Sequence, residues 1–498
     1  MARYDVASGL NEAGGRKRRQ AQIETGGEES QLRPLDRLRA TNLVRDTVRN
    51  SPMQHGVAKT LRANIVGSYG KLRFNAAGDW YDGAARYFNT VWARAADFTD
   101  GTSWRESLQL VVYALAHDGD FVAVFDDGIL SGRKGGTGRL CFFESDQIAN
   151  LAPSAFEPYA KRGFRQESGI VFDRLGRKCG VVVSSHRGMT EVPKEGSAVL
   201  LCDPDDPIEA RNWLHVARKF RLRQSRGVAD ALPAVQSAID ALEILNLELQ
   251  SAKVSASRYA TVYQSNPAAD PLAGTGFSQT PAGEGAEGGE AEAAEVEEDL
   301  HADALETYTG GNVDYLMEGD KVDVTPANRP NPNLQPFLDY VTDIDGASFG
   351  LSHAYSRLKA DTSYTAFRGD MVMTWMVFED FQQFLEDAFS DWVARRVLDR
   401  AVGLGILGEP PEGWHESIAW QYPTMPSVDG QKEQAAIAAK LRNGLTSLRK
   451  EYGPDWKSNL KELAEERDEC RRLGLTLSFM ESTPGAVTEP ADTDNRED

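Results

Sequence analysis

The sequence has no lysine or arginine between Arg258 and Lys321, and this gap contains a run of glycine, alanine and glutamate at 281–299. Acidic low-complexity sequence buries too little apolar surface to fold by itself, so we expect a disordered acidic insertion at about 265–305. The formal net charge of the whole chain is −20. Because an acidic surface repels nucleic acid and anionic membranes on average, any contact with DNA must be local.

Cysteines and long apolar runs are also scarce. The cysteines are scattered along the chain at Cys141, Cys179, Cys202 and Cys470. No pair has metal-ligand spacing, and we expect reduced thiols in a cytosolic setting. No window approaches about 18 uninterrupted apolar residues, which predicts no membrane span and no membrane partner. Basic residues at 16–19 have no apolar run behind them, so we expect a disordered basic tail at 1–34 and no signal peptide.

Recognisable catalytic patterns are missing as well. The seven histidines are isolated, no HExxH or GxSxG sequence occurs, and GRKGGTGR at 132–139 does not fit GxxxxGKS or GxxxxGKT. Acids that could suggest a two-metal nuclease lie around one predicted strand: Asp118, Asp120, Asp126 and Asp127. Turn chemistry and solvation of a sheet edge account for them better, because no histidine or lysine constellation accompanies them. We predict no catalytic residue, metal or cofactor, with a metal-carboxylate nucleic-acid enzyme as the alternative.

Hydrophobic periodicity is what the sequence does offer. Helical patterns run from Leu35 to the residue before Pro52, and from Gln54 to Val66. Short β-branched or aromatic runs follow at 120–126, 139–145, 168–173, 179–185 and 197–203, and Asp173 to Gly176 predicts a hairpin between two of them. Glycines predict the ends of three later helices, near Gly403 or Gly405, at Gly444 and at Gly474. Strands that follow helices without regular βαβ alternation indicate an α+β fold, here mainly helical. A chain of this length predicts two or more domains.

A strong helical pattern begins at Ala229, continues to Lys253 and predicts a long helix that could run to about Tyr259. Its apolar residues recur at three-four spacing, which predicts a packing seam too long for a small module to cover. The seam consists of Leu232, Val235, Ile239, Leu242 and Leu249.

The most informative segment is Gly346 to Asp370, a polar, tyrosine-bearing stretch between two helical patterns. A short helical pattern through Phe337, Val341 and Ile344 leads into it, and an aromatic stripe from Phe367 to Trp392 predicts a long buried helix behind it. A loop projecting between two supported helices is where function tends to lie. Its candidate functional residues are Tyr355, Arg357, Lys359, Tyr364 and Arg368.

Several stretches, in a fixed order from about residue 35 to 476, resemble the lambda-type family of portal proteins of tailed bacteriophages. They are NIVGSYG within 48–74, HDGDFVAVF within 103–125, ESDQIAN at 144–150, RQSRG at the start of 223–256, SHAYSRLKADTSYTAFRGDM at 352–371, and VDGQKEQA at the start of 428–466. Two features depart from the family pattern. Phe367 stands where the family has a small residue, and the acidic stretch resembles an insertion.

The resemblance implies a portal-type fold with a wing, long stem helices, a small clip, a tunnel loop and a helical crown. The implied ranges are the wing at 35–228, stem helices at 229–262 and 331–350, the clip at 263–330, the tunnel loop at 351–367, a long wing-spanning helix with its connection at 368–427, the crown at 428–476 and a disordered tail at 477–498.

The resemblance also implies a passive channel and no enzyme. Such a protein forms a ring, usually of twelve subunits, at one vertex of the capsid in the virion, after assembly in the host cytoplasm. The terminase packages double-stranded DNA through the ring, the DNA later leaves by it, and head-tail adaptor proteins dock on it. The implied partners are further copies of the chain, the terminase large subunit, adaptor, major capsid and scaffold proteins, and DNA bound non-specifically.

On this chain the resemblance gives roles to particular residues. The tunnel-loop tyrosines and Leu358 would shape the constriction, and Arg357, Lys359 and Arg368 would touch phosphates without reading bases. The alternative role for Tyr355 and Tyr364 is to pack the loop against its neighbour. Tyr308 and Tyr315 would contact partners at the clip. A non-channel internal capsid or scaffold protein is the remaining alternative.

Overall fold

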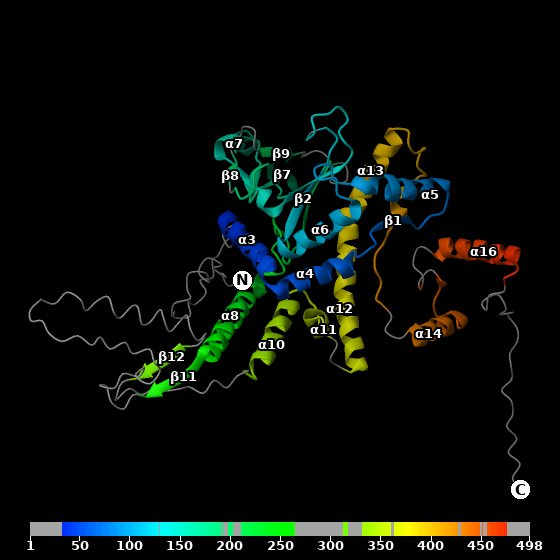
Figure 1. Ribbon diagram of the computed structural model, residues 1–498. Helices are drawn as coiled ribbons and strands as arrows, with labels where there is room; N and C mark the ends of the chain where they lie inside the picture. The colour runs from blue at the N-terminus through cyan, green and yellow to red at the C-terminus, as the bar shows by residue number, and fades with distance from the viewer. Residues whose placement is uncertain are drawn as a thin grey trace, which may run out of the picture.

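Helices and strands are mixed in the computed structural model, as the α+β expectation requires (Figure 1). The structure describes residues 32–128, 130–189, 191–192, 198–202, 211–263, 312–316, 331–359, 363–426, 430–448, 451 and 456–475. Some predictions concern residues outside this description. They are those for the tail at 1–31, the acidic insertion at 265–305, Tyr308 and the tail at 477–498. No helix in the described ranges is long and apolar enough to cross a membrane.

The first helices begin and end where local chemistry predicts. The helix α3 (Pro34–Asn50) ends before Pro52, which opens α4 (Pro52–Ile65), since proline fits the first turn of a helix. At the start of α6 (Trp104–His117) the Ser103 side chain accepts a hydrogen bond from the Glu106 amide, and the Glu106 side chain accepts one from the Ser103 amide in return. Between α4 and α6 lie α5 (Asp79–Arg86), the π-helical turn η1 (Tyr87–Val91) and the 3₁₀ turn η2 (Trp92–Ala95).

Two antiparallel sheets share a small core next to these helices. In the first sheet β2 (Asp120–Phe125) lies between β10 (Trp213–Ala217) and β3 (Leu140–Glu144), with all six β2 residues buried. The order of the second sheet is β5 (Arg165–Glu167), β6 (Ile170–Phe172), β7 (Lys178–Ser184) and β9 (Ala198–Cys202). The runs predicted as strands are confirmed, whereas the short β5 and β10 were not predicted.

The turn between β6 and β7 was predictable from the sequence because its own residues stabilise it. The Asp173 carboxylate accepts hydrogen bonds from the backbone amides of Leu175 at 2.9 Å and Arg177 at 2.8 Å. Gly176 supplies the positive φ of 79° that the turn needs.

Shorter elements join distant parts of the chain. The strand β1 (Lys71–Phe74) pairs antiparallel with β13 (Ile418–Gln421), with Lys71 opposite Gln421. The remaining short elements of the body are η3 (Ser145–Gln147), β4 (Asn150–Leu151), α7 (Pro153–Lys161), β8 (Glu191–Val192) and η7 (Trp414–Ser417). The pairing of β1 with β13 places the chain after the long aromatic helix against the first helices.

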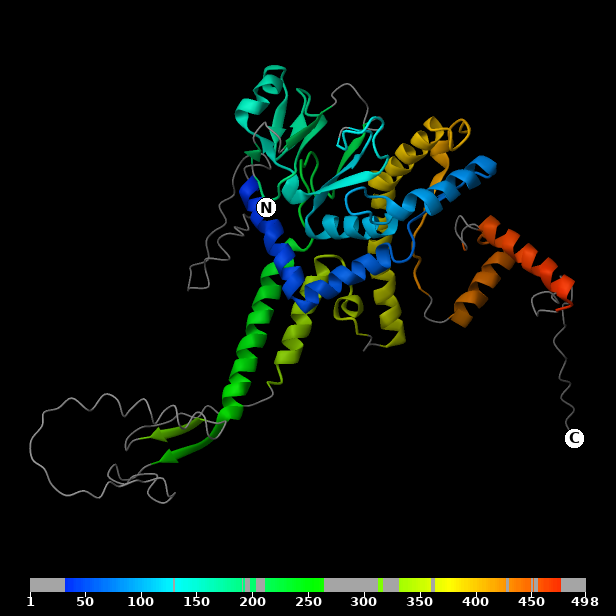
Figure 2. The ribbon, with the colours of Figure 1, turned by 45° about the horizontal axis from the view of Figure 1, so that its top comes forward.

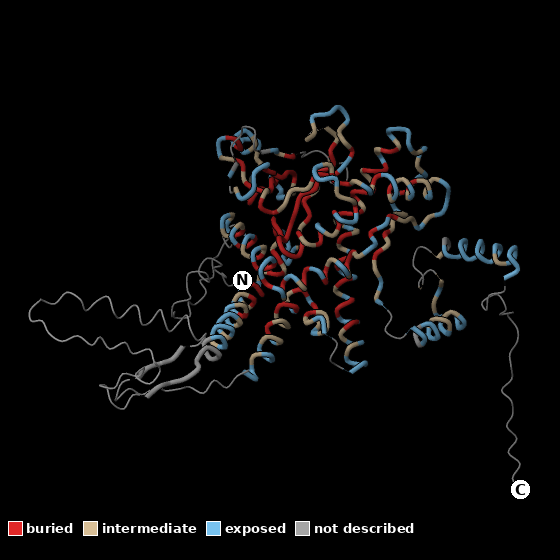
Figure 3. Tube along the Cα trace, viewed as in Figure 1, coloured by how far each residue is buried: buried red, intermediate tan, exposed pale blue. Residues whose placement is uncertain are grey.

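The predicted aromatic stripe is one long helical rod. It comprises α12 (Tyr364–Leu385), the π-helical turn η6 (Glu386–Ser390) and α13 (Asp391–Gly403). Its aromatic side chains at 375, 378, 381, 389 and 392 are buried, and Figure 3 shows the buried residues gathered along the rod and the first sheet. The helix ends before Gly405, whose φ of 70° stops it as expected.

The helix implied at 229–262 is longer at both ends than the helix that the structure shows. Pro233 lies in a 3₁₀ turn, η5 (Leu232–Ala234), and the α-helix α8 starts only after it (Val235–Ser257). From Arg258 the backbone pairs as a strand, β11 (Arg258–Tyr263), parallel to β12 (Asn312–Leu316), on which Tyr315 lies. The helix α10 (Leu334–Ala347) falls inside the predicted 331–350.

The last two described helices are α14 (Gly430–Arg442) and α16 (Trp456–Leu473). Both end as predicted, because Gly444 and Gly474 take φ values of 66° and 69°. At the first of these ends the Leu445 amide donates to the Lys440 carbonyl at 2.9 Å, a C-terminal cap of the Schellman kind. In Figures 1 and 2 these two helices stand beside the body, while α8 and α10 extend from the side opposite the sheets.

Candidate functional site

The segment Gly346 to Asp370 contains a short helix, α11 (His353–Arg357), between α10 and α12. The predicted loop at 351–367 is therefore shorter than expected. Its far end is shortened too, because the Ser363 hydroxyl accepts a hydrogen bond from the Ala366 amide and starts α12 at Tyr364 instead of Arg368. Residues 360–362 lie outside the description.

The helix α11 sits directly on the end of α10. A Cβ atom placed on Gly346 would lie 1.6 Å from the Ser356 hydroxyl, so a larger residue at 346 would push the two helices apart. On the other side the Ser352 amide donates to the Thr374 hydroxyl of α12 at 3.0 Å. The segment is thus held to both of the helices that flank it.

Arg357 ties α11 to acids of α10. Its Nε donates to Asp343 Oδ1 at 2.8 Å, and Nη1 reaches Asp339 Oδ2 at 3.3 Å. His353 Nδ1 lies 2.9 Å from the other Asp343 oxygen. Burial alone would raise the pKa of Asp343, but the hydrogen bonds from Arg357 and His353 outweigh it and hold that pKa below its ordinary value. The positive charge of Arg357, which was predicted to contact phosphates, is therefore already paired with acids of the same chain.

The other candidate residues of this segment divide into an inner and an outer group. Tyr355 is partly buried, with its ring edge-on to Phe378 at 5.6 Å between centroids, and burial raises its pKa. Leu358 is 68% exposed in a left-handed conformation with φ 52°. Lys359, Tyr364 and Arg368 are exposed as well.

The seam on α8 is buried at one end only. Val235 is 3% exposed, and Ile239 and Leu242 are partly buried, because this half of α8 packs against α3 and α10. The remaining seam residue, Leu232, lies in η5 and is also partly buried. Leu249 is 54% exposed, and Leu247, which points to nearly the opposite side of the helix, is 56% exposed. Figure 3 shows the change from buried to exposed along the helix.

A second arrangement, which the sequence did not predict, joins two of the resembling stretches. Arg226 is 1% exposed, and its Nη2 donates to Asp120 Oδ1 at 3.0 Å while its Nε donates to Asp120 Oδ2. The same guanidinium donates to the carbonyls of Ser145 at 2.9 Å and Ser168 at 2.8 Å. Burial would raise the pKa of Asp120, but Arg226 and His215 outweigh it and hold that pKa well below the ordinary value.

Two glycines allow this buried pair to form. A Cβ on Gly227 would lie 1.9 Å from the Gly119 carbonyl oxygen, and Gly119 itself has φ 93°. The Gly227 amide donates to Asp120 Oδ2 at 3.0 Å. Both stretches, HDGD and RQSRG, were visible in the sequence, but nothing in either indicated that they contact each other.

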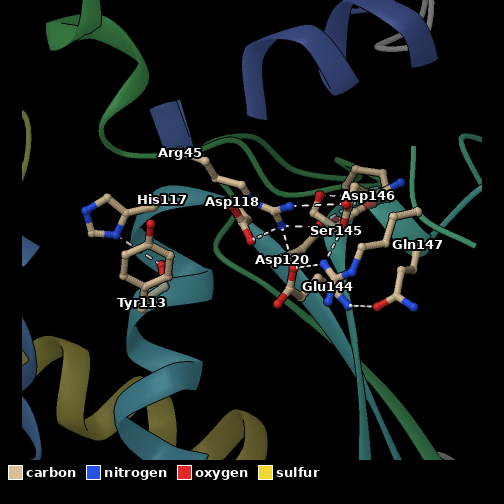
Figure 4. A network of polar contacts seen from close by, with 11 residues as sticks. Arg45, Tyr113, His117, Asp118, Asp120, Glu144, Ser145, Asp146 and Gln147 are labelled. Carbon is tan, nitrogen blue, oxygen red and sulfur yellow. Dashed lines mark hydrogen bonds and ion pairs between the residues drawn. The ribbon is translucent and has the colours of Figure 1, made fainter. Parts of the chain in front are cut away.

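A third polar network surrounds Arg45 of α3 (Figure 4). Arg45 donates to both Asp118 oxygens, at 2.8 and 2.6 Å, and to Glu144 Oε2 at 2.9 Å, and it lies 3.1 Å from Asp146. Burial raises the pKa of Asp118 to about 6 although Arg45 acts against it. The network fixes α3 to the end of α6 and the end of β3.

The acids of the nuclease alternative have separate partners. Asp118 and Asp120 bind arginines, while the Asp126 carboxylate accepts the backbone amides of Gly128 at 3.0 Å and Thr137 at 2.8 Å. Asp127 accepts a hydrogen bond from Asn212. Among the described residues, no group of three or more His, Cys, Asp or Glu side chains could hold a metal ion. These carboxylates orient the chain around β2.

Comparison with known families gives a match to a family model. A family model described as phage portal protein, lambda family, matches residues 14–382 of the 498-residue chain. The match contains the Asp120–Arg226 pair and the whole segment Gly346 to Asp370, and it ends within α12. The helices α14 and α16 lie beyond it. No curated protein matches the chain.

Proposed function

The chain belongs to the lambda family of phage portal proteins, and from this premise we propose that it forms a ring-shaped channel at one capsid vertex. Double-stranded DNA enters through the ring during packaging by the terminase and leaves through it at ejection. Head-tail adaptor proteins dock on the ring, which is set among major capsid and scaffold proteins. The family match over residues 14–382 carries this proposal.

The exposed half of α8 supports a ring. Leu247 and Leu249 leave more than half of their side-chain surface in solvent, and Ile244 is 37% exposed, on a helix that extends away from the body. Apolar side chains gathered on one helix are stabilised when another surface removes them from water. We assign that surface to the neighbouring copy, because identical subunits in a ring place the same helix beside each other.

The segment Gly346 to Asp370 supplies the proposed lining of the channel. Leu358, Lys359, Tyr364 and Arg368 are exposed and form its surface, while Tyr355 and Arg357 fix α11 to α12 and α10. Few basic groups in each subunit suit a channel through which DNA slides, because each neutralised phosphate adds salt-dependent affinity. Contacts to the DNA backbone also carry no sequence information, as transport of a whole genome requires.

Imaging of the purified chain tests the proposal. We expect negative-stain images to show rings with a central hole, and light scattering to give a mass many times that of one chain. A stable monomer that nicks plasmid DNA in the presence of a metal would favour the enzyme alternative. Particles without a hole would favour an internal capsid or scaffold protein.

Removing the exposed charges of the lining tests the interaction with DNA. In Lys359→Ala/Arg368→Ala we expect intact rings and weaker DNA binding, with the slope of log affinity against log salt shallower by about 0.9 for each phosphate that is no longer neutralised. The measurement is a salt titration of non-specific duplex binding to purified rings. Lys161→Ala is the control, because this α7 lysine is 74% exposed and lies outside the segment. An unchanged slope in the double variant would contradict binding to phosphates, and failure to form the ring would identify the segment as an interface.

A further inference from the structure

A buried carboxyl group lies at the base of the segment Gly346 to Asp370. Asp345, near the end of α10, is 0% exposed, and neither carboxyl oxygen has a hydrogen-bond partner. Gln54 on α4 is also 0% exposed, and both of its amide atoms are unpartnered. The Ser51 hydroxyl at the start of α4 is buried and has no hydrogen-bond partner either. Buried polar atoms of folded proteins are nearly always hydrogen-bonded, so the unpartnered atoms of Asp345 and Gln54 require an explanation.

The position of Asp345 connects it to the proposed channel lining. The next residue is Gly346, on which Ser356 of α11 sits. The helix α4 packs against α10, α11 and α12. The Thr342 hydroxyl of α10 lies 3.1 Å from the Met53 sulfur of α4, across the same interface. A change in the packing of α4 against α10 therefore acts directly on the helix that carries Tyr355 and Arg357.

The surroundings of Asp345 favour the neutral acid. Burial raises the pKa of Asp345 to about 7, and the nearby Gln54 amide opposes that rise only in part, without reaching hydrogen-bond geometry. Several elements that carry charged or titratable groups surround Asp345. These groups are His55, Lys59 and Arg62 on α4, His353, Tyr355 and Arg357 on α11, Asp240, Glu243, Glu248 and Lys253 on α8, and Asp339, Tyr340 and Asp343 on α10 itself. None of them contributes to the shift of Asp345.

We propose that Asp345 is a proton-operated latch at the base of the segment Gly346 to Asp370. As the neutral acid it lets α4 and α10 pack together without water beneath α11. An unpaired charge is far more costly to bury than a neutral acid. The carboxylate form therefore favours hydration of the interface between α4 and α10, which loosens α11 and the residues that follow. The latch is a property of a single subunit; its effect on a DNA channel rests on the proposed function.

The direction of the pH effect follows from the raised pKa. In the folded chain Asp345 keeps its proton up to about pH 7, whereas the ordinary value is 3.8. The stabilising contribution is complete below the ordinary value, declines as pH rises, and is lost once pH passes the folded pKa. The latch is therefore closed in mildly acidic solution and open in mildly alkaline solution.

Hydrogen exchange of the full chain at pH 6 and pH 8 tests the latch. After correction for the intrinsic exchange rate, we expect amides of α11 and of the start of α12 to open about tenfold more often at pH 8, as linkage to one such group predicts. In Asp345→Asn, which is neutral at both pH values, the difference should vanish. Absence of any such difference in the wild-type chain would overturn the proposal without the need for a variant.

A second variant separates Asp345 from the nearby histidine. Histidine titrates near neutral pH as a residue type, and His353 contacts Asp343 on the same pair of helices. In His353→Asn we expect the tenfold difference to remain, because Asp345 is unchanged. A difference that disappears in His353→Asn and persists in Asp345→Asn would overturn the assignment. Failure of the chain to form rings would contradict the proposed function and leave this result intact.

Discussion

Replacing Arg226 with alanine is expected to lower the free energy of unfolding by about 3–5 kcal/mol, the usual cost of removing one partner of a buried ion pair. Asp120 is 0% exposed and would lose the guanidinium that now balances its charge. The Ser145 and Ser168 carbonyls, which accept hydrogen bonds from the same side chain, would lose these donors as well. The destabilisation should appear as a lower midpoint in urea unfolding followed by circular dichroism.

Two further variants make this expectation specific. Arg177→Ala removes an arginine that pairs with Asp173 but is 71% exposed, and it should cost at most about 1 kcal/mol because water screens such pairs. In Arg226→Met/Asp120→Leu both charges are gone, so the double variant should be less destabilised than Arg226→Ala. A single variant as stable as Arg177→Ala would show that the buried pair does not stabilise the fold.

Replacing Phe389 with alanine is the second change with a large expected effect, a destabilisation of about 3–5 kcal/mol typical of emptying a large aromatic site in a core. Phe389 is 0% exposed and stacks on Trp104 of α6 at 5.6 Å between ring centroids. It also meets Phe121 of β2 edge-on at 5.4 Å. The ring therefore joins the aromatic rod to the first helices and to the first sheet, and its removal leaves a cavity where three elements meet.

Thermal and urea unfolding measure this effect, with two comparisons. Leu175→Ala removes apolar atoms from a side chain that is 75% exposed in the turn after β6, and it should change stability by less than about 0.5 kcal/mol. Phe389→Leu keeps much of the volume and should be less destabilised than the alanine variant. Equal destabilisation of the leucine and alanine variants would point to a specific aromatic interaction and contradict the cavity explanation.

The sequence predicted best those features that depend on neighbouring residues. Pro52 separates α3 from α4, Asp173 closes the hairpin, and Gly444 ends α14, because each acts through backbone geometry within a few positions. The short helix α11 was missed, because a helix of one turn contains no periodic pattern. The start of α8 was placed too early, because its apolar spacing continues through Pro233 while the α-helix does not.

The candidate site was predicted less completely than the fold. The sequence indicated where the segment between α10 and α12 lies and which residues it carries. It gave Arg357 the same role as Lys359 and Arg368, although Arg357 pairs with Asp343 and Asp339. This pairing depends on the orientation of α11 against α10, and the spacing of residues along the sequence does not reveal that orientation.

The sequence by itself determined the longer helices of the body, the main strand runs, the acidic gap between Arg258 and Lys321, and the family, because periodicity, composition and ordered motifs are properties of the chain read in one dimension. The tertiary structure alone decided which charges are paired. Asp120 and Asp345 are both fully buried, yet the first meets Arg226 from a distant part of the chain and the second meets only an uncharged amide. Desolvation and pairing set the state of a carboxyl group, and both depend on which remote residues the fold brings together.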